Sequence, residues 1–535
     1  MVNAGPATAE PPPSAWAPLR VPAYRNLALA ILATNIGLWM QTVGAQWLLV
    51  HEASASALVA MVQTASMLPI LLLALPAGAL ADTFDRRRLL LAVQGYLVVV
   101  AVILTTLTAL GRMPPALLLT LTFALGVGQA LTLPAWAAII PELVPRRELQ
   151  SASALGAISV NVARSIGPAV AGVLVAKAGV AVVFAIDAVG FVLFAIALLR
   201  WQPGYARSGE APERFTAALR AGGRYVRHSP VVRRLLLRAI LFLAPASALW
   251  ALLPLIASRR LGMSSSGYGL LLAALGIGAI IGGLLLPWVR ARLSTNQFLL
   301  AAAVLYGLTL LAVALTRNVP LVLLALMPAG LSWVIALSNI NAEIQLFLPG
   351  WVRARGLGVY QVCFAGTQAL SAMAWGFVSQ ATGLVAAHLA AAVLMFLGAL
   401  SVRLWPVPDL RGFKGDPASY WPELRLTLKP DRRAGPVLVT VTYTVRPECE
   451  RDFVAAMDLV RESRQRTGAV RWGLFRKGEA GQCFVEVYQL PSWDEHLRQH
   501  RNRLTRADQE AEERARALTE GESETSHLLP ADADS

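Results

Sequence analysis

The stretch that decides the fold is Gly78-Ala-Leu-Ala-Asp-Thr-Phe-Asp-Arg-Arg-Arg88, a short polar segment between two long apolar runs. The run before it covers residues 56–81 and the run after it covers residues 89–110. Each exceeds the roughly 20 residues that a helix needs to cross about 30 Å of hydrocarbon. Three consecutive arginines between such runs predict a cytoplasmic loop, because membrane proteins concentrate Arg and Lys on that side.

The same alternation of apolar runs and polar breaks continues along most of the chain. Hydrophobic residues make up 56% of the 535 residues and charged residues only 15%, against about 25% charged in a soluble domain. This composition excludes a soluble enzyme with polar domain surfaces. We predict an all-α membrane protein with twelve transmembrane helices in two six-helix halves. The predicted spans are 26–50, 56–81, 89–110, 115–140, 153–176, 180–199, 235–257, 267–288, 297–316, 319–342, 357–380 and 384–403.

The distribution of basic residues predicts the orientation. With the N-terminus inside, the cytoplasmic segments of residues 1–405 hold 21 Arg or Lys residues and the opposite side holds 5. This bias favours a multi-pass protein of the cell inner or plasma membrane with both termini in the cytoplasm. A net charge of +15 is compatible with nucleic-acid binding. Because the basic residues lie in short loops between apolar runs, we expect the lipid bilayer as the partner, and no nucleic acid.

The chain changes character after residue 405. Residues 437–445 alternate as a strand, a helix follows from Pro447, two strands fit 469–476 and 482–490, and Ser492 begins a further helical region that includes 505–519. The order β-α-β-β-α predicts a small C-terminal α+β ferredoxin-like cytoplasmic domain. The expected parts are a disordered N-terminus 1–20, halves 21–200 and 235–405, a central loop 201–234, a linker 406–434, the soluble domain 435–520 and a disordered tail 521–535.

The decisive stretch resembles the loop motif G-x-L-x-D-R-x-G-R-R/K of the major facilitator superfamily. The matching positions are Gly78, Leu80, Asp82, Arg86 and Arg87. Thr83 and Asp85 depart from the pattern. The resemblance implies a gating role, in which the loop holds the two halves together against the eleventh helix, expected to start near Gly356. The alternative is an ordinary basic loop in which Asp82 lies beside a helix start.

The fifth span resembles the antiporter motif G-x8-G-x3-G-P-x2-G-G of the same superfamily. The motif positions are Gly167, Pro168, Ala171 and Gly172, and Ala replaces Gly at three positions. The resemblance implies export rather than import. The alternative is that small residues simply let helices approach closely in the membrane.

Further stretches resemble the exporter branch that contains enterobactin exporters and permeases with an appended soluble domain. They are Thr34–Val43, Pro134–Pro145, Asn341–Gln345, Arg471–Arg476 and Ser492–His500. The resemblance implies a secondary active transporter, a proton-coupled exporter of small molecules (siderophore-like, drug or metabolite) working by alternating access. The usual Arg of the fourth span is absent, and Thr122 or a neighbour occupies its place.

Ionisable residues within membrane spans are expected to be functional. Arg164, Asp187 and Glu343 are the three candidates for proton coupling. Asp187 is the best of them, because burial lets a carboxyl take up and release a proton near neutral pH. Two alternatives are open: Asp187 pairs with Arg164, or Glu343 pairs with Arg353 or Arg355.

Polar and aromatic residues of the spans are candidates for a substrate cavity. Trp39, Trp47, Trp136, Trp250 and Trp333 could stack on an aromatic substrate, or lie at the membrane interface. The polar candidates are Asn35, Gln41, Gln46, Asn161, Asn339, Asn341 and Gln361.

The sequence predicts no catalytic residues, no cofactor and no metal site. There is no Walker-type loop for ATP. His496 and His500 have the i, i+4 spacing of metal ligands, but without an obvious third ligand we expect them on a solvated face. Dimerisation or regulation are roles open to the C-terminal domain. The alternative to a transporter is a membrane-tethered sensor or enzyme with its active part in that domain.

Overall fold

The structure, a computed structural model, describes residues 14, 16–202, 222–408, 418, 420–421, 427, 430–432 and 434–530. Within these residues, eleven helices are long and apolar enough to cross a membrane. The further apolar helix α13, Leu384–Leu400, has 17 residues. The prediction of a helical membrane protein is confirmed, whereas the count of twelve spans stays a prediction.

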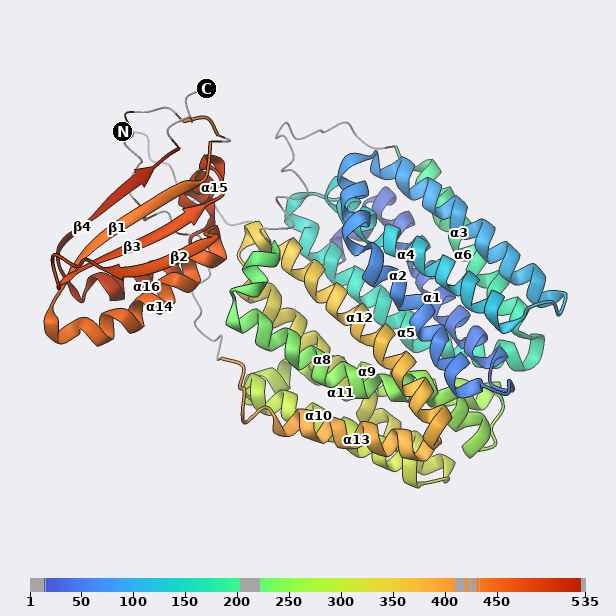
Figure 1. The fold of residues 1–535 in the computed structure, drawn as a ribbon. Helices are drawn as coiled ribbons and strands as arrows, with labels where there is room; N and C mark the ends of the chain where they lie inside the picture. Colours follow the sequence, from blue (N-terminus) through green and yellow to red (C-terminus); the bar gives the residue numbers. More distant parts are fainter. Residues whose placement is uncertain are drawn as a thin grey trace. The chain divides into compact units, whose positions relative to one another are not determined.

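The helices follow the predicted spans closely (Figure 1). The first residue of a helix is the least predictable feature, because polar residues can extend an apolar helix beyond the membrane. For example, α12 begins at Gly350 rather than near Gly356. The bounds are α1 Pro22–Leu48, α2 Ala55–Thr83, α3 Arg86–Ala109, α4 Pro115–Leu143, α5 Leu149–Ala178, α6 Val180–Arg200, α8 Pro230–Leu255, α9 Ser265–Arg292, α10 Thr295–Leu315, α11 Val319–Phe347 and α12 Gly350–Thr382.

Local sequence explains where several helices begin and end. The side chain of Asp85 accepts a hydrogen bond from the backbone N–H of Arg88 and caps α3. Ser294 and Gln297 form a capping box at the start of α10. Gly179 separates α5 from α6 at φ +82°, and Gly383 separates α12 from α13 at φ +89°. Both tight turns need the conformational freedom of glycine.

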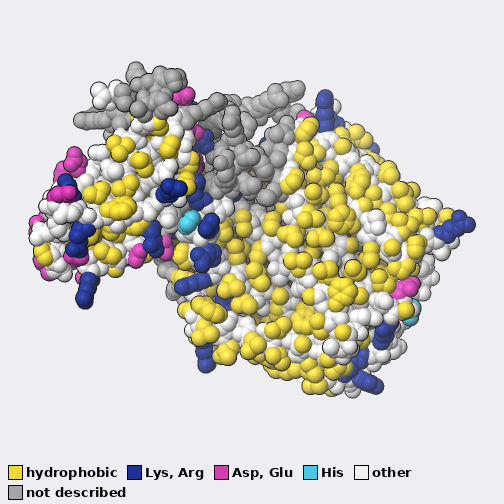
Figure 2. All heavy atoms as spheres, in the orientation of Figure 1, with side chains coloured by type: hydrophobic (Ala, Val, Ile, Leu, Met, Phe, Trp, Pro, Cys, Tyr) yellow, Lys and Arg dark blue, Asp and Glu magenta, His cyan; other side chains and the backbone are white. Residues whose placement is uncertain are grey.

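Two compact units make up the described chain, and each is described by itself. The first contains residues up to 212, 239–337 and 362–404; the second contains 213–238, 338–361 and 405–535. In the first unit we call the side where α1 begins the near side, and the side where α1 ends and α2 begins the far side. In Figure 2 the helical part exposes a broad hydrophobic surface, and charged side chains gather at its rims. This is the distribution that a lipid environment favours.

The C-terminal domain is a four-stranded antiparallel sheet with helices on one face (Figure 1). Its elements are β1 Val437–Val445, α14 Glu450–Thr467, β2 Arg471–Arg476, β3 Cys483–Leu490, α15 Trp493–Arg498, α16 Arg506–Arg516 and β4 Thr519–Leu528. The strand order is β2-β3-β1-β4. Alternate residues of β1 are buried beneath α14, where Phe453 and Met457 complete the core. The topology β-α-β-β-α-β is the ferredoxin-like pattern.

One expectation about this domain is wrong. Residues 521–528 are not part of a disordered tail, because β4 continues to Leu528 and pairs with β1. The strand is polar, and Thr519 and Thr525 are its only β-branched residues, so that pairing with β1, rather than its own sequence, determines its conformation. The expected disordered N-terminus, central loop and linker lie largely outside the described residues.

Candidate functional site

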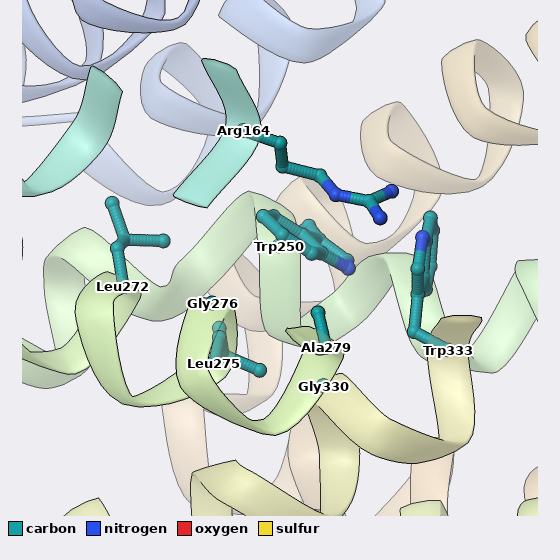
Figure 3. A pocket seen from close by; sticks show the side chains of 8 residues that line it. All are labelled: Arg164, Trp250, Leu272, Leu275, Gly276, Ala279, Gly330 and Trp333. Atoms are coloured by element: carbon teal, nitrogen blue, oxygen red, sulfur yellow. The ribbon is translucent and has the colours of Figure 1, made fainter. Parts of the chain in front are cut away.

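A small pocket lies in the first unit between α5, α8, α9 and α11 (Figure 3). The side chain of Arg164 extends from α5 toward the indole rings of Trp250 on α8 and Trp333 on α11. The pocket therefore draws on helices from both predicted halves and combines one cation with two aromatic rings. The other lining residues are Leu272, Leu275, Gly276, Ala279 and Gly330.

The aromatic side chains around the pocket form a continuous cluster. The ring centroids of Trp250 and Trp333 are 5.3 Å apart, and those of Trp39 and Trp250 are 5.9 Å apart. Phe242 and Phe364 extend the cluster from Trp333, at 6.3 and 6.4 Å. Aromatic rings attract one another at such separations in tilted or edge-to-face geometry. A planar ligand could join this cluster without polar desolvation.

Two of the predicted stacking residues lie elsewhere. Trp47 stacks on Tyr268, with centroids 6.1 Å apart and planes 13° apart. Trp136 packs edge-to-face against Phe194 at 5.8 Å. Neither lines the pocket, so only Trp39, Trp250 and Trp333 of the five candidates are brought together.

Arg164 and Asp187 do not form the ion pair that is one of the alternatives for these two charges. A guanidinium nitrogen of Arg164 donates to Oδ1 of Asn161, one turn earlier on α5. Asp187 on α6 is only 1% exposed, and neither of its carboxylate oxygens has a hydrogen-bond partner among the described residues. An ionised carboxylate without a partner is costly to bury in such a place.

Asp187 is held against α1. A Cβ atom built at Gly37 would lie 2.6 Å from Asp187 Oδ1 and 2.8 Å from its Cα atom. Only glycine therefore fits at this contact. A buried carboxyl confined at a helix–helix contact is a site where protonation can affect packing.

Two of the three polar candidates of α1 make hydrogen bonds to other helices. Gln41 donates to the hydroxyl of Thr122 on α4 at 3.4 Å. Gln46 accepts a hydrogen bond of 2.7 Å from Tyr268 on α9. Asn35 is half-buried. The place of the usual fourth-span Arg thus holds a short hydroxyl that Gln41 contacts.

The remaining polar candidates belong to the second unit. Asn339 on α11 is buried, Glu343 is half-buried, and Gln361 on α12 is exposed. Asn341 accepts a hydrogen bond of 3.2 Å from Gln345, one turn later on α11. These residues are therefore spread along two helices, and the residues that line the pocket do not include them.

The small residues of α5 place this helix in contact with both predicted halves. A Cβ atom at Gly167 would lie 2.9 Å from Cβ of Trp39 on α1. A Cβ atom at Gly172 would lie 2.7 Å from Cα of Gly269 on α9. Pro168, inside α5, and Ala171 are buried between these contacts. The motif positions therefore allow backbone-to-backbone packing near the far side.

Further contacts close the far side of the first unit. The hydroxyl of Thr64 on α2 donates to the carbonyl of Ala369 on α12 at 2.8 Å. A Cβ atom at Gly376 would lie 2.6 Å from Cβ of Ala60. With the Gln46–Tyr268 hydrogen bond between α1 and α9 and the packing of Gly172 against Gly269, these contacts join the predicted halves through three helix pairs on the far side.

The decisive loop makes contacts within the first predicted half. Arg86 forms an ion pair of 2.5 Å with Glu142 at the end of α4. Arg87 donates to the carbonyls of Leu198 and Leu199 at the end of α6, at 2.9 and 2.7 Å. Cations at helix C-termini are favourable. The loop thus fixes the ends of α4 and α6 to the start of α3.

Asp82 lies in α2, three residues before the residue that caps α3. α2 continues to Thr83, so that Asp82 lies in its last turn, and Asp85 caps α3 instead. Gly78 and Leu80, earlier in α2, are half-buried. Asp85 is therefore the cap of α3, and the gating role of Asp82 stays a prediction.

The sequence analysis did not identify the residues of α9 against which α5 packs. A Cβ atom at Gly276 would lie 3.0 Å from Cα of Ser165, and Gly269 faces Gly172. These two glycines are seven residues apart and therefore lie on one face of α9. The sequence shows this spacing, but small residues are common in membrane helices. The spacing alone therefore does not predict which helix packs against this face of α9.

In the C-terminal domain, the structure adds a third histidine to His496 and His500. His527 on β4 lies with its ring centroid 4.9 Å from that of His496, and His500 lies 6.3 Å from His496. His496 is 1% exposed, so the expectation of a solvated face is wrong for this residue. Within the described ranges, no group of three or more His, Cys, Asp or Glu residues is arranged to hold a metal ion.

A bundle of apolar helices with a pocket between two sets of helices defines a secondary transporter of small molecules, of the major facilitator type. Residues 13–532 match the family model of transmembrane secretion effectors, and the chain belongs to that family. The match includes the C-terminal domain.

Curated relatives include two siderophore transporters. The chain is 25% identical to the staphyloferrin A transporter of Staphylococcus aureus over 299 residues, 55% of this chain and 74% of that protein. It is 30% identical to an enterobactin exporter of Escherichia coli over 279 residues, 52% of this chain and 61% of that protein. The chain therefore spans less than two thirds of the exporter's length.

Solved structures share the fold. A bacterial homologue of the human lysosomal transporter Spinster, in an inward-facing occupied conformation, has a TM-score of 0.60 at 16% identity, covering 74% of this chain and 98% of that chain. A D-xylose–proton symporter has a TM-score of 0.57 at 14% identity, covering 72% and 98%. At these identities the likeness concerns the fold alone.

Proposed function

We propose that the chain is a proton-coupled exporter of small molecules, such as a siderophore-like compound, a drug or a metabolite, and works by alternating access. The observation that carries the proposal is the pocket itself, which α5 of one predicted half and α8, α9 and α11 of the other line together. A site between two halves can be exposed to either side in turn when the halves rock.

Export is supported by the motif on α5 and by the relatives. Gly167 and Gly172 permit the close packing of α5 against α1 and α9, which a far-side closed state requires. One relative is an enterobactin exporter. Arg164, beside two indoles, favours a substrate with a negative group and an unsaturated or planar part.

Proton coupling is assigned to Asp187, with Arg164 and Glu343 as further candidates. Asp187 is buried and unpaired within the described residues. A carboxyl in this environment can hold a proton in one conformation and release it when water or a cation reaches it in the other. No catalytic residue and no cofactor enter the proposal.

We further propose twelve spans with both termini in the cytoplasm, two six-helix halves at 21–200 and 235–405, and an appended domain. Topology is tested by single cysteines in a variant without Cys363, Cys449 and Cys483. Lys177→Cys, exposed at the far end of α5, should react with a membrane-impermeant thiol reagent in intact cells. Gly478→Cys, in the open turn between β2 and β3, should react only after permeabilisation. The reverse pattern overturns the orientation.

Transport is tested in cells that express the chain, by efflux of catecholate and citrate-type siderophores with and without a proton uncoupler. We expect the chain to lower the retained amount of one class, and the uncoupler to abolish this effect. Arg164→Gln should weaken efflux of anionic substrates, while Arg112→Gln, exposed in the far-side loop, should leave it unchanged. Unchanged retention of every substrate, with the chain in the membrane, favours the alternative of a membrane-tethered sensor or enzyme.

A further inference from the structure

The C-terminal domain contacts the segment that leads into α8, and both belong to the second unit. A guanidinium nitrogen of Arg224 lies 2.5 Å from Oε1 of Glu495 on α15. Both terminal guanidinium nitrogens of Arg503 donate hydrogen bonds to the same carboxylate, at 2.6 and 3.0 Å. The side chains of Arg224 and Glu495 are 17% and 14% exposed. One largely buried carboxylate therefore joins a cation of the domain to a cation outside it.

Aromatic rings complete this contact. Tyr225 is 2% exposed and packs edge-to-face against Trp351 at the start of α12, with centroids 5.7 Å apart. Both rings are covered by cations of the domain. The guanidinium carbon of Arg466 lies 5.8 Å from the Tyr225 ring centre, and that of Arg503 lies 4.7 Å from the Trp351 ring centre. Cation–π contacts of this kind gain strength when they are shielded from water.

The contact keeps Glu495 ionised, because two guanidinium groups, those of Arg224 and Arg503, share this one carboxylate. Burial by itself would raise the pKa of Glu495, but the hydrogen bonds and charges of Arg503 and Arg224 hold it below its ordinary value. Separation of Arg224 from Glu495 would expose the faces of Tyr225 and Trp351 to water. Breaking a buried ion pair by removing one partner is much costlier than loss of a surface pair.

The start of the linker is also fixed to α8. Arg238 donates to the carbonyl of Trp405 at 2.5 Å, and Arg234 donates to the carbonyl of Pro406 at 3.0 Å. The chain is therefore held to α8 where it leaves the helical part, as well as through the domain. Two attachments at separate points oppose rotation of the domain about a single hinge.

We propose that Arg224, Tyr225, Trp351, Glu495 and Arg503 form a clamp that keeps the C-terminal domain docked on the segment before α8 and on the start of α12 throughout transport. Trp351 belongs to α12 of the second predicted half, and Arg224 and Tyr225 lie in the segment that leads into α8 of that half, so the domain moves with that half when the halves rock. A molecule or second copy that binds the domain would thereby act on the transport helices. The transport part of this inference rests on the proposed function, whereas docking does not.

Docking is tested by hydrogen exchange on the full-length protein in lipid nanodiscs. Arg224→Gln combined with Trp351→Ala should speed amide exchange of residues 222–228 and of α15 by about tenfold or more, because docking limits their opening. Arg227→Gln is the matched control, since Arg227 is an exposed arginine of the same turn. Equal exchange in the double variant and in the wild type overturns the clamp.

A covalent link tests whether the C-terminal domain stays docked throughout transport. In the cysteine-free variant, Arg224→Cys and Glu495→Cys are joined with a short bis-maleimide, and linkage is read as a mass shift. We expect the linked protein to transport at the rate of the cysteine-free parent. Loss of transport on linkage, with the parent active, shows that the domain must undock and overturns the proposal. An inactive parent would instead count against the proposed function, while the exchange experiment would still decide docking.

Discussion

The carboxyl group of Asp187 on α6 lies against Gly37 on α1, at a contact where a Cβ atom would come within 2.6 Å of Oδ1. The two residues therefore form a single packing element. The carboxyl is 1% exposed and has no hydrogen-bond partner among the described residues. Its charge state and the distance between α1 and α6 should depend on each other, because a charged group there would draw in water or a cation.

This contact predicts that Gly37→Ala impairs transport. The added methyl group would overlap Asp187 Oδ1 and Cα, and overpacking of this kind costs about 1–3 kcal/mol. The expected result is a severalfold to hundredfold lower transport rate at a near-normal membrane level, measured in proteoliposomes. Gly95→Ala on α3 is the control, because a Cβ atom there has no neighbour within 4 Å. Wild-type rates in Gly37→Ala would refute a role for the contact.

We expect substitutions of Asp187 to separate proton coupling from substrate binding. Asp187→Asn should abolish efflux driven by a proton gradient and keep downhill exchange, because the amide fits the site but carries no titratable proton. Asp187→Glu should retain part of the driven activity. The measurement is substrate accumulation in inverted vesicles, with and without an imposed gradient. Continued accumulation by Asp187→Asn would make the residue structural.

The sequence predicted most of the helices because lipid imposes one length and one composition on them. Span limits from apolar runs, such as 180–199, differ from the observed α6, Val180–Arg200, by a single residue. β1 and β3 could be predicted equally well, since alternation of apolar and polar residues identifies a half-buried strand. β4 was missed because the segment has no alternation of apolar with polar residues, and pairing with β1 defines the strand.

The candidate site was predictable in its parts but not in its assembly. Arg164, Trp250 and Trp333 stand out individually as a charge and aromatic rings in membrane spans, yet they are far apart in sequence and their convergence depends on helix packing. The Arg164–Asp187 pair seemed reasonable for two charges in adjacent helices. Residue spacing gives helical depth, but it does not give the direction of a side chain around the helix.

Packing of α5 against α9 predicts a selective effect on the far side. Gly172→Val places a branched side chain where Cα of Gly269 lies 2.7 Å from the position that the new Cβ atom would take, so the far-side closed state should become rarer by about one to two orders of magnitude. A cysteine at Ser265, which is buried at the start of α9, should then react faster with an impermeant thiol reagent. Gly156→Val on the same helix is the control, since its Cβ position is open. Equal labelling rates would contradict the closure assigned to this contact.

The histidines of the C-terminal domain predict that its stability falls in mild acid. Burial, together with His527 and His500, lowers the pKa of His496 to about 3, against an ordinary value of 6.5. Below pH 6.5 the unfolded chain therefore binds a proton that the folded domain excludes. The stabilising contribution is complete above that pH and decreases by about 1.4 kcal/mol per pH unit as the pH falls from 6.5 toward 3. Burial also lowers the pKa of His527, which adds to the effect.

The measurement is hydrogen exchange of β1 and β3 in the full-length protein, compared between wild type and His496→Phe at each pH so that the intrinsic chemistry cancels. The wild type should lose protection relative to the variant as the pH falls from 7 to 5, because phenylalanine fills the buried site without binding a proton. His51→Phe, in the exposed far-side loop of the first unit, should follow the wild type. A wild-type domain whose protection tracks that of His496→Phe across this range would show that His496 does not determine the acid sensitivity.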